Sequence, residues 1–68
     1  MENLKHAPYM KLKGKMRENN VVTNDLADLL NLSLTSVTQK INGQSDFFLS
    51  EATKIVNNYN WDYDIFLN

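Results

Sequence analysis

Val-Thr-Asn-Asp-Leu-Ala-Asp-Leu-Leu-Asn-Leu-Ser-Leu-Thr-Ser-Val-Thr-Gln-Lys-Ile-Asn-Gly, residues 22–43, is the stretch that decides how this chain is expected to fold. It holds two short amphipathic patterns separated by Asn31, a residue type that tolerates a positive φ. In the second pattern Val37 and Ile41 are four residues apart, so a helix places both on one inward face. The stretch therefore predicts two short helices joined by a tight turn, the second with a polar outer face.

The flanking residues predict further helices and no strand. We expect a first helix over residues 9–19, then helices over residues 23–30, 33–41 and 49–58, and a final turn that contains Ile65 and Phe66. Thr23, Ser33 and Asp62 are the expected N-caps. The expected inward residues are Tyr9, Leu12, Met16, Leu26, Ala27, Leu30, Val37, Ile41, Leu49, Ala52, Ile55, Val56 and Tyr59. The sequence thus predicts a compact all-α domain of five helices over residues 9–68, preceded by a loose arm, residues 1–8.

Composition narrows the class of protein. The chain has 68 residues, a formal net charge of −1, 43% hydrophobic residues and no cysteine. It is therefore expected to fold as one small domain without a disulfide or a thiolate metal site. It contains no apolar run long enough to span a bilayer, and the N-terminus lacks the apolar stretch of a signal peptide. We expect a cytoplasmic protein that does not bind membranes.

Several motifs, in this order and at this spacing, resemble the Cro and lambda-repressor-like helix-turn-helix family, above all its small phage-encoded single-domain members. The matching stretches are Asp-Leu-Ala-Asp-Leu-Leu-Asn-Leu-Ser at 25–33, Thr-Ser-Val at 35–37, Lys-Ile-Asn-Gly at 40–43, and the segments 48–55 and 61–66. Three positions depart from the family pattern: Val22-Thr23 replaces Thr-Gln, Asn31 replaces Gly, and Ile41 replaces Glu. The resemblance implies a lambda-repressor-like fold that binds double-stranded DNA.

The resemblance also implies a set of contact residues. Base edges in the major groove would be contacted by Leu34, Thr35, Ser36 and Gln39, and phosphates by Thr23, Ser33, Thr38, Lys40 and Asn42. Cationic residues crowd the first predicted helix and could flank phosphates: Lys11, Lys13, Lys15 and Arg17. The alternative for both groups is an ordinary solvated helix face.

Apolar residues outside the predicted core suggest self-association. Family members usually bind two-fold operators as dimers, which makes Phe47, Phe48, Trp61 and Tyr63 candidates for a dimer face. The alternative is that these side chains simply cap the core.

No set of residues indicates catalysis, a cofactor or a metal site. His6 is the single histidine and lies in the arm, and Asp62 and Asp64 lack the ligand count of a calcium loop. We expect neither an enzyme nor a small-molecule effector.

The function predicted from the sequence is sequence-specific transcriptional regulation of the phage Cro/repressor type, by occupancy of a double-stranded DNA operator through a helix in the major groove. The second hypothesis is a helix-turn-helix scaffold that binds another regulator as an antirepressor or modulator. The acidic net charge is the main support for that second hypothesis.

Overall fold

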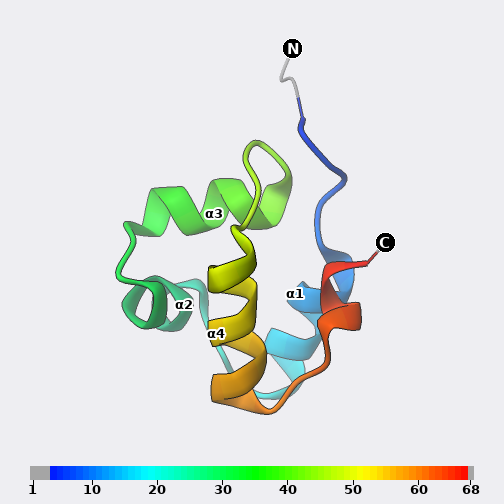
Figure 1. Cartoon of the computed structure of the whole chain (residues 1–68), viewed down its shortest axis with the longest axis vertical. Coiled ribbons are helices and arrows are strands. Elements are labelled where there is room, and N and C mark those ends of the chain that lie inside the picture. The colour runs from blue at the N-terminus through cyan, green and yellow to red at the C-terminus, as the bar shows by residue number, and fades with distance from the viewer. Residues whose placement is uncertain (1–3, 68) are drawn as a thin grey trace.

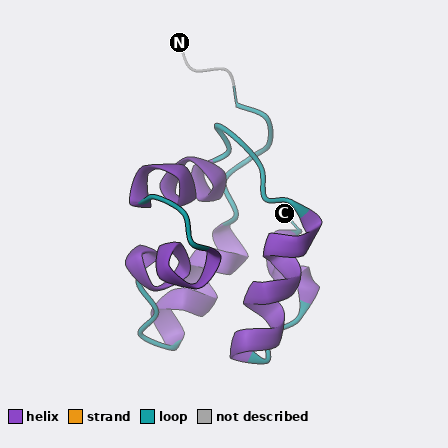
Figure 2. Cartoon of the chain, turned by 60° about the vertical axis from the view of Figure 1, so that its left-hand side comes forward, coloured by secondary structure: helices purple, strands orange, loops and turns teal. Residues whose placement is uncertain are grey.

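The computed structural model describes residues 4–67, and these form four α-helices and one short 3₁₀ helix, without a strand. The α-helices are α1 (Met10–Glu18), α2 (Thr23–Leu30), α3 (Leu34–Asn42) and α4 (Leu49–Tyr59), and the 3₁₀ helix is η1 (Tyr63–Phe66). Figure 1 shows α3 lying across the upper end of the molecule, with α2 below it and α4 running downward. A turned view shows the same helices packed around one centre (Figure 2). The prediction of a compact all-helical domain is confirmed.

Asparagine and glycine end the helices, as their backbone preferences predict. Asn31 and Asn60 follow α2 and α4 with φ of 56° and 57°, and Gly43 follows α3 with φ of 95°. At the other end of α3, Ser33 Oγ accepts a hydrogen bond from the backbone N–H of Ser36 at 3.1 Å. The turn between α2 and α3 and the predicted cap at Ser33 are therefore confirmed.

One predicted cap is wrong, and another holds the cap position without a side-chain hydrogen bond. Thr23 is the first residue of α2, and Val22 occupies the cap position. There the carboxylate of Asp25 accepts the backbone N–H of Val22 at 2.9 Å, so an acidic side chain in the first turn does the capping. Asp62 precedes η1 but its side chain makes no capping hydrogen bond. The predicted fifth helix is accordingly a single 3₁₀ turn, since so short a segment cannot support an α-helix alone.

The core lies where α1, α2, α3 and α4 converge. Its fully buried side chains are Leu12, Leu26, Val37 and Ile55, each 0% exposed and each from a different helix. Burying a side chain of this size contributes roughly 1.5–3 kcal/mol. Leu49 is an error of prediction, because it is 77% exposed at the first position of α4, one turn before the inward stripe begins at Ala52.

The described part of the predicted arm is fastened to the domain. The backbone N–H of Lys5 donates to Gly43 O at 2.6 Å, and that of Tyr9 donates to Ile41 O at 3.0 Å. Residues 5–9, hereafter the N-terminal strap, therefore run beside the end of α3 (Figure 1). The rest of the predicted arm, residues 1–3, lies outside the described residues, as does residue 68.

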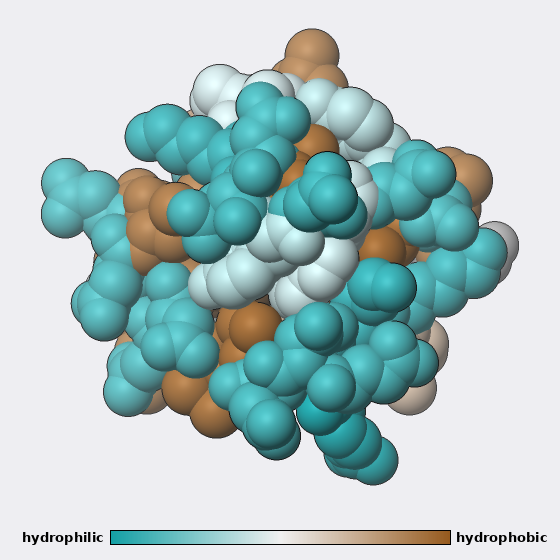
Figure 3. Space-filling view, turned by 90° about the horizontal axis from the view of Figure 1, so that it is seen from below, coloured by the Kyte–Doolittle hydropathy of each residue, from teal (hydrophilic) through white to brown (hydrophobic). Residues whose placement is uncertain are grey.

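The end of the molecule away from α3 is mainly hydrophilic. Figure 3 views the molecule from below and shows hydrophobic side chains only in separated small areas on this face. No helix among the described residues has the length and apolar character needed to cross a membrane.

Candidate nucleic-acid interface

The outer face of α3 is polar, uncharged and accessible. Thr35, Thr38 and Gln39 are exposed, and Leu34 is 48% exposed. Ser36 is half-buried, because its hydroxyl pairs with that of Ser33 at 3.0 Å across the first turn. The helix is anchored from below by Val37 and Ile41, which are 0% and 4% exposed. The inner side of α3 is therefore packed against the core, and its outer side is available to a partner.

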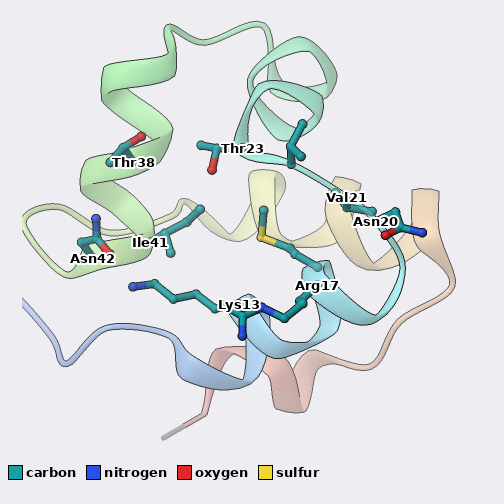
Figure 4. A pocket seen from close by; sticks show the side chains of 10 residues that line it. Lys13, Arg17, Asn20, Val21, Thr23, Thr38, Ile41 and Asn42 are labelled. Carbon is teal, nitrogen blue, oxygen red and sulfur yellow. The ribbon is translucent and has the colours of Figure 1, made fainter.

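A hollow of about 550 Å³ lies between α1, the start of α2 and the second half of α3. Its polar lining includes Lys13, Arg17, Thr23, Thr38 and Asn42. Figure 4 shows Thr23 and Thr38 facing each other across the hollow, while Lys13 extends from α1 toward Asn42. Three of the residues predicted to contact phosphate thus meet at one place.

The hollow carries positive charge that nothing described neutralises. Among residues 4–67, the ion pairs are His6 with Asp46 and Lys40 with Glu51, so Lys13 and Arg17 belong to neither. The lining contains no acidic residue. Along the sequence, no aspartate or glutamate occurs between Asp28 and Asp46, the span that contains all of α3. An anion at the hollow would meet two cations, hydroxyls and an amide.

Lys40, which was predicted to contact phosphate, is buried. It is 8% exposed, and its ammonium donates to Glu51 Oε1 at 2.8 Å and to Asp46 O at 3.0 Å. The same nitrogen lies 4.6 Å from the ring centroid of Phe48. An ammonium held by a carboxylate and covered by an aromatic ring is unavailable to phosphate, so Lys40 is a structural residue. Its charge had suggested a surface position, since the sequence offered no sign that Glu51 faces it.

The candidate dimer residues divide into two half-buried and two exposed side chains. Phe47 and Trp61 are half-buried against the core, Phe47 beside Tyr9 and Phe66, and Trp61 stacked on Tyr59 at 4.5 Å. Phe48 is 69% exposed and Tyr63 is 48% exposed, and the Tyr63 hydroxyl lies 3.0 Å from Thr53 Oγ1 of α4. The alternative of core capping therefore describes Phe47 and Trp61, and the exposed apolar pair at the start of α4 is Phe48 with Leu49.

Sequence reasoning missed a polar cluster behind the end of α3. Asp46 Oδ1 accepts hydrogen bonds from the hydroxyl of Tyr9 at 2.5 Å and from the backbone N–H of Phe47 at 2.8 Å. His6 Nε2 lies 2.8 Å from Ser45 O and 3.5 Å from Asp46 Oδ1, and its ring stacks on Tyr9 at 4.2 Å. Burial, followed by the hydrogen bond to Asp46 and its charge, raises the pKa of Tyr9 to about 12. Only the long-range fold brings these residues together.

The sequence of the chain matches a known protein family. The sequence profile of the BetR domain matches residues 10–68, nearly the whole chain. The chain belongs to the BetR domain family. BetR domains are small helix-turn-helix-like DNA-binding domains, so the chain has, at a coarse level, a DNA-binding regulatory role. No match to the chain was found among curated proteins or among solved structures.

Proposed function

We propose that this BetR domain is a sequence-specific regulator that binds double-stranded DNA by inserting α3 into the major groove. The observation that supports this most is the pairing of an exposed, uncharged polar helix face with an adjacent unneutralised cationic hollow. Base edges would be contacted by Leu34, Thr35, Ser36 and Gln39. Gln39 is suited to bidentate contact with adenine, and Leu34 is suited to contact with the methyl group of thymine.

The hollow would receive the phosphate backbone beside the groove. Thr23, Thr38 and Asn42 would donate hydrogen bonds, Ser33 would contact the next phosphate at the start of α3, and Lys13 and Arg17 would supply the charge. Phosphate contacts of this kind set the position of the helix and leave base choice to its outer face. Lys40 has no part in this proposal.

Within this proposal, the protein acts by occupying an operator in the manner of Cro and repressor proteins. It uses neither catalysis nor a small-molecule effector. A single module of this size makes few base contacts, which favours two copies on half-sites one helical turn apart. Phe48 and Leu49 are the exposed apolar residues that a homodimer would cover first. A phage origin and a cytoplasmic location belong to the same proposal, on the resemblance to Cro and lambda-repressor-like proteins.

A protein-binding modulator remains the second candidate, and one observation favours it. With Lys40 buried, the outer face of α3 carries no positive charge, in a chain whose net charge is −1. Such a face attracts DNA weakly at long range. An antirepressor would use the same helix against another regulator.

Selection from a random DNA pool, followed by titration at several salt concentrations, separates the two candidates. The DNA regulator predicts an enriched motif and an affinity that falls as salt rises. Lys13→Ala should reduce the slope of log affinity against log salt by about 1 while leaving the preferred sequence unchanged. Lys54→Ala, at an exposed lysine of α4 outside the hollow, is the matched control and should leave the slope unchanged. An unenriched pool together with a stable complex with another regulator would favour the modulator.

A further inference from the structure

The C-terminal end of α3 is capped by residues from the other end of the chain. The last carbonyls of a helix have no partner within it and need donors from elsewhere. Here Tyr9 N donates to Ile41 O at 3.0 Å, while Lys5 N and His6 N donate to Gly43 O at 2.6 and 3.4 Å. The N-terminal strap therefore completes a helix that begins more than twenty residues later in the sequence.

Side-chain hydrogen bonds also hold the N-terminal strap against the domain. The hydroxyl of Tyr9 donates to Asp46, whose backbone carbonyl accepts from the buried Lys40 ammonium, and that ammonium is paired with Glu51 at the start of α4. The strap, the last turn of α3, the connecting loop and the first turn of α4 are thus joined through Asp46. Hydrogen bonds restrict this cluster, in which Tyr9 and Lys40 are 7% and 8% exposed, while the side chain of Asp46 is 56% exposed.

We propose that this cluster positions the recognition helix, and that Tyr9 and Asp46 are positioning residues for DNA binding although they lie behind α3. The inference rests on the proposed function, because it assigns the orientation of α3 to contacts outside the DNA-facing surface. A helix released at one end spends part of its time in orientations that do not fit the groove. The apparent dissociation constant then rises in inverse proportion to the competent fraction.

Tyr9→Phe tests the proposal with one atom removed. The variant keeps the ring that packs against His6, Phe47 and Phe66 but loses the hydrogen bond to Asp46. We expect about fivefold weaker binding to the DNA selected by the wild-type protein, measured where both proteins are fully folded. Tyr59→Phe removes the same atom from a tyrosine near the far end of α4 and should change the affinity less than twofold. Equal affinity of Tyr9→Phe and wild type would overturn the proposal, because a residue that only stabilises the fold leaves binding by the folded protein unchanged.

Amide hydrogen exchange provides a readout that needs no DNA. Gln44 N donates to Gln39 O at 3.0 Å, so its amide reports on the last turn of α3. In Tyr9→Phe the amides of residues 40–45 should exchange about fivefold faster, while those of α2 keep their wild-type rates. If the wild-type protein selects no DNA, the proposed function fails. The positioning of α3 by the strap is then upheld by faster exchange confined to residues 40–45 and overturned by unchanged or uniformly faster exchange.

Discussion

The two ends of α3 are built in opposite ways. Its first turn is capped by the adjacent residue Ser33 and leaves Leu34 and Thr35 exposed. Its last turn is held by the N-terminal strap and by the buried Lys40–Glu51 pair, with Ile41 4% exposed. The contrast shows how a small domain presents a polar helix face: long-range contacts fix the last turn of α3, while the outer face of the helix stays accessible to a partner.

Gly43→Ala should break the fixed end most severely. Gly43 has φ of 95°, and an added Cβ would stand 2.0 Å from the backbone oxygen of His6. Backbone strain and displacement of the strap together should lower the free energy of unfolding by about 4 kcal/mol, measured by urea denaturation. Gly14→Ala is the matched control, since its Cβ would meet nothing within 4 Å, and it should stabilise α1 by about 0.5–1 kcal/mol. Similar stabilities for the two variants would contradict the role given to the strap.

Lys40→Ala should affect the fold rather than the DNA contacts. It leaves Glu51 without its ionic partner in a place where the side chain of Glu51 is 12% exposed. The free energy of unfolding should fall by about 3 kcal/mol, and the salt dependence of DNA binding by the folded variant should stay as in wild type. A salt slope reduced by about 1 would return Lys40 to the phosphate contacts.

Gln39→Ala should act only at the outer face of α3. The side chain is exposed, so stability should be unchanged within about 0.5 kcal/mol. Binding to the selected DNA should weaken by about 1–3 kcal/mol, with relaxed preference at one base position in a competition assay. Asn57→Ala, at an exposed polar residue of α4, should alter neither. Unchanged base preference in Gln39→Ala would show that the outer face of α3 is not the recognition surface.

Alkaline pH should also weaken the fixed end. Because the pKa of Tyr9 is raised to about 12 from 10.0, the folded protein keeps a proton that the unfolded chain loses above pH 10. This contribution to stability is complete below pH 10 and declines by about 1.4 kcal/mol per pH unit toward pH 12. Thermal unfolding of Tyr9→Phe should lose stability less steeply than wild type over this window. Parallel curves for the two proteins would show that Tyr9 lacks the hydrogen bond and burial assigned to it.

The same contrast explains what could be predicted from the sequence. The first turn of α3 and the turns at its two ends depend on residues that are neighbours in the sequence. Asn31, Ser33 and Gly43 therefore carried enough local information to place α2 and α3. Lys40 was misplaced because its partners are Glu51 and Asp46, whose approach depends on how α4 packs. Residues 5–8, which include His6, were assigned to a loose arm because no local pattern signals hydrogen bonds to residues almost forty positions away.

Apolar patterning had a similar limit. The helical repeat identified the buried positions of α1, α2 and α3, but it could not tell that α4 enters the core only from Ala52 onward, leaving Leu49 exposed. Nor could it separate Phe47, which packs against Tyr9 and Phe66, from its exposed neighbour Phe48.

The most direct test of the central claim is a titration of isotope-labelled protein with the selected DNA duplex, followed by NMR chemical-shift changes. Recognition by the outer face of α3 predicts the largest changes at Leu34, Thr35 and Gln39, with further changes at Thr23, Thr38 and Asn42 around the hollow. Changes confined to Phe48, Leu49 and η1, with α3 unaffected, would contradict it.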